Sequence, residues 1–369
     1  MWHVRAAVLE AVGQPLRVME LQLDPPRAGE VTVRILASGV CHSDVHRADG
    51  DWGDVPPTVL GHEGAGLVEE TGDGVQGLPP GQLVVLNWYY PCLACPACTG
   101  GRQWVCTGTR AGDHLQQDGT TRLRTQAGGD VLAYLSIGTF AEREVVPAQA
   151  AITIPAEVPP RVAALIGCCV TTGVGAVTNT ARIPAGASVA VIGLGGVGLS
   201  AVMGAVLSRA APIIAVDRAP EKLEIALKMG ATATVLATED VEETLRDISA
   251  ATGGGPGFAI EAVGHPATAD LAIRCLPMGG TAVLVGIPRF GDRSSFEIRE
   301  VVESSQRIIG SNYGSAVPAV DFPRLARLYL EGRLPIDLLI EKTISLDDVN
   351  GALDALRRGE GARRVIVFD

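Results

Sequence analysis

Hydrophobic and polar residues alternate along much of the first part of the chain, a pattern typical of strands with one buried face. The runs are short and are separated by turns containing residues such as Pro25, Pro26 and Gly29. This pattern predicts strands at residues 16–23, 30–36, 66–70 and 82–87. Residues 112–137 are instead polar and glycine-rich, and we expect them to form a long surface excursion. The first part of the chain is therefore expected to be mainly β.

Beyond about residue 163, strand-like apolar runs alternate with helical ones. Strands are predicted at 188–192, 212–216, 258–263 and 281–287, and helices up to about 209 and at 221–229 and 268–275. Such alternation predicts a parallel, doubly wound sheet. Amphipathic runs at 322–331 and 347–358 and a last strand at 365–368 are expected to pack back on the first domain. The fold class is therefore α/β, with a doubly wound domain over 170–312 and a mainly β domain over 1–169 and 313–369.

Charge and cysteine content narrow the classes of function. The 369 residues carry a net charge of −11, which argues against nucleic-acid or anionic-membrane partners, since both require a positive face. The first ten residues do not have the pattern of a signal peptide. The longest apolar stretches are broken by glycine, proline or charge well short of a membrane span. We expect a cytoplasmic protein, in which the eight cysteines are better explained as metal ligands or free thiols than as disulfides.

A glycine-rich turn, Gly193-Leu-Gly195-Gly196-Val197-Gly198, follows an apolar strand and opens a helix. Such glycines allow a tight turn, close approach of the backbone to a pyrophosphate and close helix–strand packing. A turn chosen only for packing is the alternative. Asp217 ends the next predicted strand, where an acid accepts hydrogen bonds from the adenosine ribose. Because this carboxylate would repel a 2′-phosphate, NAD is predicted over NADP, although Arg218 beside it weakens that preference slightly.

Cys92, Cys95, Cys98 and Cys106 form a C-x2-C-x2-C-x7-C run in a stretch rich in glycine and proline. Four thiolates at this spacing can surround one tetrahedral zinc ion, which would fix an otherwise irregular loop. An iron–sulfur cluster also uses four cysteines, and a disulfide pair is an alternative that the cytoplasm disfavours. Because four protein ligands leave no position for substrate, the expected role is structural.

Three further segments carry metal-ligand residue types: Cys41-His42-Ser43-Asp44-Val45-His46, Gly61-His62-Glu63 and Gly167-Cys168-Cys169. Each segment alone is compatible with ordinary core residues. Together with the glycine-rich turn and the cysteine run, in matching order and spacing, they resemble the zinc-dependent medium-chain alcohol dehydrogenases. The resemblance extends over essentially the whole chain, to Arg363 near its end. It implies a Rossmann coenzyme domain and a mainly β catalytic domain.

The resemblance also implies a catalytic zinc ion held by Cys41, His62 and Cys168, with a fourth position open for water or substrate. Glu63 is similar to the family's acid that sits behind the zinc and ligates it transiently. Asp44 would orient the ring of His62. The family commonly has glycine after the third ligand, where this chain has Cys169.

Proton transfer and coenzyme contacts are implied in the same way. Ser43 resembles the family's relay hydroxyl, and His46 the histidine that passes the proton onward through the ribose. Without the resemblance, they would be an N-cap serine and a surface histidine. The residues that resemble NAD contacts of the family lie at the pyrophosphate (His42 and Arg363), near the adenosine ribose (Lys222) and at the nicotinamide end (Thr172, Val197, Val263 and Val285).

The implied reaction is reversible oxidation of a small alcohol to an aldehyde or ketone with hydride transfer to NAD. One catalytic and one structural zinc ion per chain are expected. Trp52 and Trp88 fall where family members line the substrate pocket, which favours an apolar or flat alcohol. Segment 112–137, with His114, resembles the long loop of animal alcohol dehydrogenases and glutathione-dependent formaldehyde dehydrogenases, which are dimers. A homodimer joined near residues 281–309 is therefore expected.

Three alternatives remain open from the sequence. A thiol-adduct formaldehyde dehydrogenase would use the same zinc and hydride chemistry. An enzyme that retains its nicotinamide would need an external hydride acceptor. A non-catalytic zinc- and nucleotide-binding relative would be expected to lose a catalytic ligand, whereas Cys41, His62 and Cys168 are all present.

Overall fold

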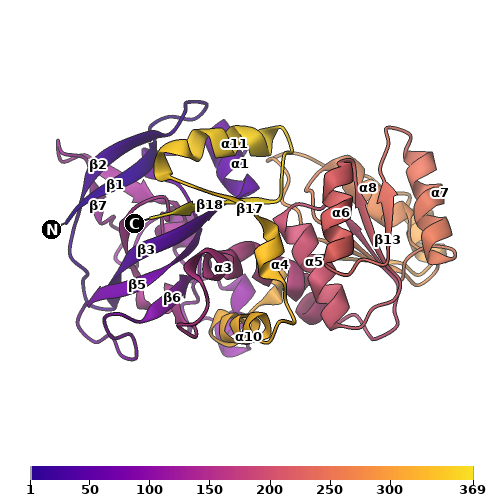
Figure 1. Cartoon of the computed structure of the whole chain (residues 1–369), viewed down its shortest axis with the longest axis horizontal. Helices are drawn as coiled ribbons and strands as arrows, with labels where there is room; N and C mark the ends of the chain where they lie inside the picture. Colours follow the sequence, from indigo (N-terminus) through magenta and orange to yellow (C-terminus); the bar gives the residue numbers. More distant parts are fainter. Residues whose placement is uncertain (1, 369) are drawn as a thin grey trace. The chain divides into compact units, whose positions relative to one another are not determined.

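The computed structural model describes residues 2–368 (Figure 1). The chain forms two compact units. The first comprises the chain up to Cys168, Val317–Gly332 and the segment from Ile340 onward, and the second comprises Cys169–Ala316 and Arg333–Leu339.

Within the described part of the chain, the first unit contains two β-structures. One is a closed barrel with strand order β1 (Trp2–Leu9), β2 (Arg17–Leu23), β7 (Leu123–Arg124), β8 (Asp130–Ala133) and β4 (Thr58–Val59). The other is a sheet with strand order β10 (Ala151–Thr153), β6 (Leu83–Leu86), β5 (Glu63–Thr71), β3 (Glu30–Val40), β18 (Arg363–Val367) and β17 (Ile340–Ile344), with β9 (Arg143–Pro147) also paired to β3. Each has its own hydrophobic core.

Strand β3 is longer than the pattern predicted, because it is buried and hydrogen-bonded on both edges. It pairs with β5 on one edge, and with β9 and then β18 on the other. The strand ends at Val40, so that Cys41 starts α1 (His42–Asp49) deep in the unit. Helix α11 (Val349–Arg357) from the C-terminal segment contacts α1, and Arg357 pairs with Asp49 at 2.6 Å.

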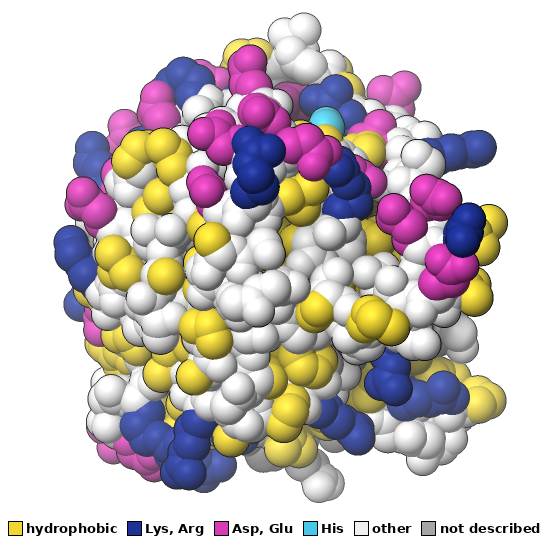
Figure 2. All heavy atoms as spheres, turned by 90° about the vertical axis from the view of Figure 1, so that its right-hand side faces the viewer, with side chains coloured by type: hydrophobic (Ala, Val, Ile, Leu, Met, Phe, Trp, Pro, Cys, Tyr) yellow, Lys and Arg dark blue, Asp and Glu magenta, His cyan; other side chains and the backbone are white. Residues whose placement is uncertain are grey.

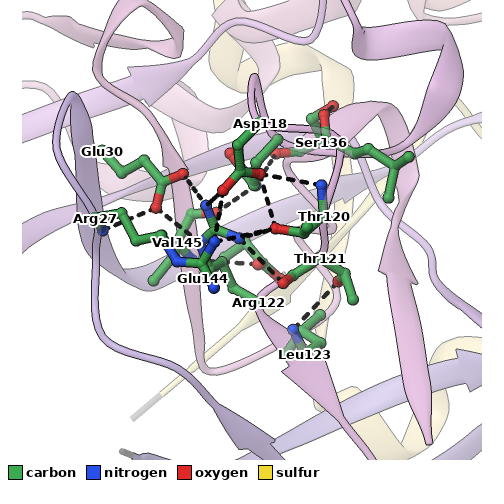
Figure 3. Close-up of polar contacts among 12 residues, drawn as sticks. Arg27, Glu30, Asp118, Thr120, Thr121, Arg122, Leu123, Ser136, Glu144 and Val145 are labelled. Carbon is green, nitrogen blue, oxygen red and sulfur yellow. Dashed lines mark hydrogen bonds and ion pairs between the residues drawn. The ribbon is translucent and has the colours of Figure 1, made fainter.

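The predicted surface excursion at 112–137 is wrong. This segment supplies β7 and β8 to the barrel, and Leu123 and Val131 are fully buried. Its polar character has another explanation, which Figure 3 shows: the Arg122 guanidinium is buried among polar partners. Arg122 Nε donates to Glu30 Oε2 and Nη2 donates to Asp118 Oδ2, each at 2.8 Å. An ion pair can be buried when both partners are hydrogen-bonded, so polar composition here reflects an internal network.

A second polar contact in this segment covers the outer edge of β9 (Figure 3). Gln116 Nε2 donates to the Val145 carbonyl at 2.8 Å, and the Val145 N–H donates to Glu144 Oε1 at 3.2 Å. The Glu144 side chain is fully buried, and burial raises the pKa of its carboxyl well above the usual value. Burial therefore favours the neutral, protonated form of this carboxyl.

The expectation that no apolar stretch reaches the length of a membrane span is also wrong. Among the described residues, Pro160–Thr180 forms a helix of 21 residues with mean hydropathy 1.6, because Gly167, Gly173 and Gly175 do not interrupt it. It consists of α3 (Pro160–Leu165), a π-helical turn (Ile166–Val170), α4 (Thr171–Gly175) and a second π-helical turn (Ala176–Thr180). Within its most apolar window, 89% is buried inside the protein, as expected for a core helix.

The second unit is a parallel sheet with the predicted doubly wound arrangement. The strand order is β13 (Ala233–Leu236), β12 (Ile213–Asp217), β11 (Val189–Ile192), β14 (Phe258–Glu261), β15 (Thr281–Leu284) and β16 (Arg307–Gly310). Figure 1 shows α5 (Gly196–Leu207) and α6 (Pro220–Lys228) on one face of this sheet, and α7 (Val241–Thr252) and α8 (Pro266–Arg274) on the other. The predicted Rossmann fold is confirmed.

The remaining helices are short or lie outside the two sheets. They are α2 (Pro96–Thr99), α9 (Ile298–Glu303) and α10 (Pro318–Leu330). In the second unit, strands β13 and β16 and helices α7 and α9 were not predicted, and in the first unit several short strands and helices, such as β7, β8 and α2, were not predicted either.

Candidate active site

Four buried side chains of the first unit converge on one point: Cys41, His62, Glu63 and Cys168, whose potential ligand atoms lie within 4.8 Å of one another. They come from separate elements. Cys41 follows β3, His62 directly precedes β5, Glu63 is its first residue, and Cys168 lies on the π-helical turn. The pairing of β3 with β5 brings Gly39 opposite Glu63, which explains how residues far apart in sequence meet. Two sulfurs, an imidazole and a carboxylate form a donor set suited to zinc.

Asp44 organises this group from behind. Its carboxylate is fully buried and accepts hydrogen bonds from the Cys41 N–H at 2.9 Å and the Gly61 N–H at 3.1 Å. The His62 Nδ1 atom lies 3.2 Å from Asp44 Oδ1. Burial alone would lower the pKa of His62, but the Asp44 carboxylate raises this pKa well above its usual value. Because the carboxylate engages Nδ1, Nε2 is the ring nitrogen left to hold a metal.

The buried guanidinium of Arg363 places a positive charge beside the sulfur of Cys41 and the carboxylate of Glu63. Arg363 Nη2 lies 3.5 Å from the Cys41 sulfur and 3.4 Å from Glu63 Oε1. A hydrogen bond from Cys168, with the charges of Arg363 and His62, holds the pKa of Cys41 well below its usual value. Burial raises the pKa of Glu63 to about 7, although Arg363 opposes the shift. Glu63 also packs against Gly39, where a Cβ atom would come within 2.2 Å of Glu63 Oε2. Position 39 therefore requires glycine.

The two neighbouring cysteines on the π-helical turn are not equivalent. Cys168 belongs to the converging group, whereas Cys169 is not among its members in the described part of the chain. A π turn is wider than an α turn and frequently occurs at functional sites. Periodicity in the sequence does not predict such a turn.

Ser43 and His46 lie on α1, close to this group. The Ser43 hydroxyl is 3.8 Å from the Cys41 sulfur. His46 lies in the last turn of α1, and its Nδ1 is 2.6 Å from Asp51 Oδ2. Its ring stacks on Trp52 with a centroid distance of 4.9 Å. The sequence analysis missed Asp51, since an acid in a loop five residues after a histidine has no distinctive pattern.

Aromatic rings surround His62. The ring centroids of Tyr134 and Trp88 lie 5.6 and 6.4 Å from that of His62, and both rings are nearly perpendicular to the imidazole. Trp88 was predicted at the substrate pocket, whereas Tyr134 was missed because it lies in the segment expected at the surface. The guanidinium of Arg47 lies over both Trp52 and Tyr134, with its central carbon 5.9 and 5.7 Å from their ring centroids.

The four-cysteine run forms a second compact group in the same unit. Potential ligand atoms of Cys92, Cys95, Cys98 and Cys106 lie within 4.8 Å of one another. The Cys95 N–H donates to the Cys92 sulfur, and the Cys92 N–H to the Cys106 sulfur, each at 3.3 Å. Backbone hydrogen bonds lower the pKa of Cys95 to about 5, while burial raises that of Cys98 to about 12. Four sulfurs fit a closed, structural metal site, because four protein ligands leave no position for a substrate.

In the second unit, the residues predicted to contact the coenzyme lie along one edge of the sheet. The turn 193–198 follows β11, Asp217 ends β12, Val263 follows β14 and Val285 follows β15. These strands are neighbours and parallel, so their carboxyl ends share one edge, which is where doubly wound sheets bind nucleotides.

The glycine-rich turn meets the steric demands of this role. A Cβ atom at Gly198 would lie 1.7 Å from the Gly193 carbonyl oxygen, whereas one at Gly195 would meet nothing within 4 Å. Gly198 therefore allows the tight helix–turn contact, and the backbone at Gly195 is open to a ligand. Asp217 Oδ2 accepts a hydrogen bond from the Leu194 N–H at 2.6 Å, which fixes the carboxylate beside the turn.

The other predicted coenzyme contacts are divided between the units. Thr172 is buried on α4, Val197 lies on α5, Lys222 is half-buried on α6 and Arg218 is exposed. His42 and Arg363 belong to the first unit, where His42 is exposed and Arg363 is buried beside Cys41 and Glu63. The predicted contact of Arg363 with a pyrophosphate stays a prediction.

Comparisons with known proteins agree with this arrangement. The family model for the alcohol dehydrogenase GroES-like domain matches residues 27–156, and that for zinc-binding dehydrogenase matches residues 196–331. The S-(hydroxymethyl)glutathione dehydrogenase of Paracoccus denitrificans is 35% identical over 376 residues, covering 99% of this chain and all of the relative. The class-3 alcohol dehydrogenase of Cereibacter sphaeroides is 35% identical, with 99% and 100% covered.

Two solved structures share the fold of this chain over nearly its whole length. An alcohol dehydrogenase zinc-binding domain protein from Burkholderia ambifaria has a TM-score of 0.93 at 36% identity, covering 100% of this chain and 99% of the other. Benzyl alcohol dehydrogenase from Acinetobacter calcoaceticus has a TM-score of 0.92 at 29% identity, with both chains fully covered. Similar to these proteins in sequence and in fold over nearly its whole length, the chain belongs to the zinc-dependent medium-chain alcohol dehydrogenase family.

Proposed function

We propose that this protein catalyses the reversible oxidation of an alcohol to an aldehyde or ketone, with zinc as Lewis acid and NAD as hydride acceptor. The observation that carries the proposal is the buried convergence of Cys41, His62 and Cys168, with Asp44 fixed behind His62. Family membership supports the same reaction class.

The residues present fit a catalytic zinc ion. Cys41, His62 and Cys168 would hold it, and the proposed fourth position stays open to substrate. Glu63 would act as a transient ligand, a role that its pKa of about 7 and its contact with Arg363 support. When bound, zinc lowers the pKa of a coordinated hydroxyl group. Asp44 would keep the Nε2 atom of His62 turned to the metal.

The second group fits a structural zinc ion held by Cys92, Cys95, Cys98 and Cys106. Two zinc ions per chain are therefore proposed. Their different surroundings predict different consequences of loss, because the second ion fixes a loop that has little regular structure of its own.

The coenzyme proposed is NAD, which supplies the acceptor for hydride. Gly193, Gly195, Gly196 and Gly198 would receive the pyrophosphate, and Asp217 would accept hydrogen bonds from the adenosine ribose. Lys222 and Arg218 would lie near that ribose, and His42 and Arg363 would supply positive charge to the pyrophosphate. The residues proposed at the nicotinamide end are Thr172, Val197, Val263 and Val285.

For the proton, we propose a path that starts at the Ser43 hydroxyl. Ser43 would accept the proton of the alcohol, and His46 would take it onward through the coenzyme ribose to solvent. The short distance from Ser43 to the Cys41 sulfur supports the first position. The placement of His46 on the next turn of α1 supports the second.

The proposed substrate is a primary alcohol with a flat, apolar group. Trp88 and Tyr134 beside His62, with Trp52 beyond His46, support this class. A protein of similar structure, from Acinetobacter calcoaceticus, is named benzyl alcohol dehydrogenase. A second candidate is the hydroxymethyl adduct of a thiol, since relatives 35% identical are named S-(hydroxymethyl)glutathione dehydrogenases. Such an adduct is itself a primary alcohol, so the same residues would serve it.

A cytoplasmic homodimer is also proposed. Strand β16 ends its sheet and pairs only with β15 among the described strands. The neighbouring segment exposes large apolar residues, namely Met278, Phe290, Ile298 and Val302. An unpaired strand edge beside apolar residues is suited to pairing with a second copy. In the upper part of the face drawn in Figure 2, acidic and basic side chains lie side by side. The net charge of −11 supports small-molecule rather than nucleic-acid partners. Light scattering of the purified protein tests the dimer.

The experiment that tests the function combines zinc content with NADH formation on short, branched and aromatic alcohols, and on formaldehyde with and without a thiol. Wild type is expected to hold two zinc ions, and Cys41→Ser one zinc ion with loss of turnover. Cys275→Ser, at a buried cysteine outside both groups, is the matched control. Turnover in Cys41→Ser equal to wild type would refute the assignment. Activity with formaldehyde only when thiol is present would select the second candidate.

A further inference from the structure

Beyond the residues assigned above, a carboxylate stands directly behind the proposed relay histidine. His46 Nδ1 and Asp51 Oδ2 are 2.6 Å apart, and both side chains are largely buried, with 15% and 13% exposed. A carboxylate can only accept a hydrogen bond, so Nδ1 carries the proton of this contact. In the neutral ring, Nε2 then has the free lone pair.

The contact is built by the end of α1. Gly50 has φ 80°, the left-handed conformation that ends many helices. This turn brings Asp51 back over the helix, where its N–H donates to the His46 carbonyl at 3.0 Å. Asp51 therefore contacts His46 twice, through backbone and side chain. The Trp52 ring stacks on the imidazole and restricts its rotation.

The other charged side chains near His46 contact other residues, and the remaining neighbour is the imidazole ring of His42. Arg47 lies over Trp52 and Tyr134, and Asp49 pairs with Arg357 of α11. His42 presents an edge-on ring with a centroid distance of 5.0 Å. Among the contacts described, the carboxylate that faces His46 is that of Asp51.

We propose that Asp51 is a positioning residue, which holds His46 in the Nδ1–H tautomer with Nε2 available as the proton acceptor at the end of the relay. This inference rests on the proposed function of His46. When Nε2 accepts the proton from the relay, the ring becomes an imidazolium that faces the Asp51 carboxylate and the C-terminal end of α1, both of which stabilise positive charge. Release of the same proton from Nε2 to solvent restores the starting tautomer, so the step is balanced.

The first test needs neither coenzyme nor turnover. Ring nitrogen chemical shifts of ¹⁵N-histidine in the zinc-loaded, coenzyme-free protein report the tautomer, with His46 assigned by comparison with His46→Gln. At a pH where the ring is neutral, wild type is expected to show a protonated Nδ1 and an unprotonated Nε2, and Asp51→Ala to lose this pattern. A wild-type Nε2–H tautomer, or an unchanged pattern in Asp51→Ala, would overturn the proposal.

The second test separates positioning from folding. Asp51→Asn, of nearly equal shape, is expected to lower kcat on the order of tenfold at unchanged KM, because positioning accounts for part of the 10²–10⁴ of general-base catalysis. Asp54→Asn, at an exposed acid in the same loop, is the matched control and should keep wild-type kcat. In a His46→Gln background, Asp51→Asn should cause no further loss, and an equal loss there would overturn the proposal. Full kcat in His46→Gln alone would instead refute the relay while leaving the tautomer result intact.

Discussion

The two cysteine-containing groups of the first unit differ in how the chain assembles them. The ligands at 92–106 lie within fifteen residues and are fixed mainly by hydrogen bonds from neighbouring backbone N–H groups. The group at Cys41, His62 and Cys168 spans more than a hundred residues and is fixed by the β3–β5 pairing, by Asp44 and by Arg363. A local group can depend on its metal for order, whereas a group built by the sheet is largely formed before the metal binds. Structural and catalytic roles should therefore separate cleanly on mutation.

The largest expected effect distinguishes the adjacent cysteines. Cys168→Ala should lower kcat/KM by about a thousandfold or more, because Lewis-acid stabilisation is worth several kcal/mol. Cys169→Ala, the matched control, removes a thiol outside the group and should keep most of the activity. Steady-state kinetics and zinc content of both variants provide the measurement. The reverse result would move the third ligand to Cys169.

The next effect concerns folding. Cys106→Ser should remove the zinc ion proposed at the four-cysteine group. It should destabilise the protein by several kcal/mol and lower Tm by about 10 °C. Activity of the protein that remains folded at low temperature should be largely retained. Differential scanning calorimetry, together with zinc content, measures this. If Tm were unchanged while one zinc ion was lost, the loop would not depend on its metal.

A smaller effect tests the support behind His62. Asp44→Asn removes the charge that faces His62 Nδ1 and keeps one acceptor oxygen, so the N–H groups of Cys41 and Gly61, which bond to different oxygens, do not both keep their acceptor. Zinc affinity at the catalytic group should fall about 10–100-fold. Competition with a chelator gives this affinity, and the four-cysteine zinc in the same sample is the internal control. Equal weakening of both ions would show that the effect is general.

The smallest effect lies outside both groups and follows from Glu144. Its pKa is raised in the folded state, so above its unfolded pKa the folded form keeps a proton that the unfolded form has released. Stability should therefore fall with rising pH between the two pKa values, by about 1.4 kcal/mol per pH unit. Glu144→Gln should remove this slope without changing zinc content. Urea unfolding from pH 5 to 8 tests it, and parallel curves for both proteins would contradict it.

The sequence was sufficient for the fold class and the family, because the glycine-rich turn, the alternation of strands and helices and the cysteine run are local patterns. It was insufficient where the structure depends on contacts between residues far apart in the sequence. The polar segment 112–137 could not be assigned to the barrel, since the buried guanidinium of Arg122 depends in part on Glu30, ninety-two residues away. Tyr134 was missed with it. The length of the core helix was missed because glycine within an apolar run is expected to interrupt it, whereas this helix continues through Gly167, Gly173 and Gly175.

The ligands Cys41, His62 and Cys168 were named from the resemblance, whereas the four cysteines at 92–106 were named from their spacing. Of the residues that orient catalytic side chains, some were predicted from the sequence and others were not. Asp44 was identified through its family role, whereas Asp51 depends on the turn at Gly50, a feature that needs coordinates. The π-helical turn at Cys168 is similar, since a single wide turn leaves no periodic signal.

The close spacing of the four cysteine sulfurs also affects how the metal-free protein reacts with oxidants. The Cys95 and Cys106 sulfurs lie 3.9 Å apart, so only a small movement would bring them to bonding distance. Thiolates that hold the proposed structural zinc ion would be protected, but a chain without the ion would leave the Cys95 thiol, whose pKa is about 5, beside potential partners. Oxidant would then convert a reversible loss of metal into a covalent change that added zinc does not reverse. The oxidised form of this loop would therefore persist after the oxidant is removed. Purification under reducing conditions with zinc present should keep the cysteines reduced and the loop native.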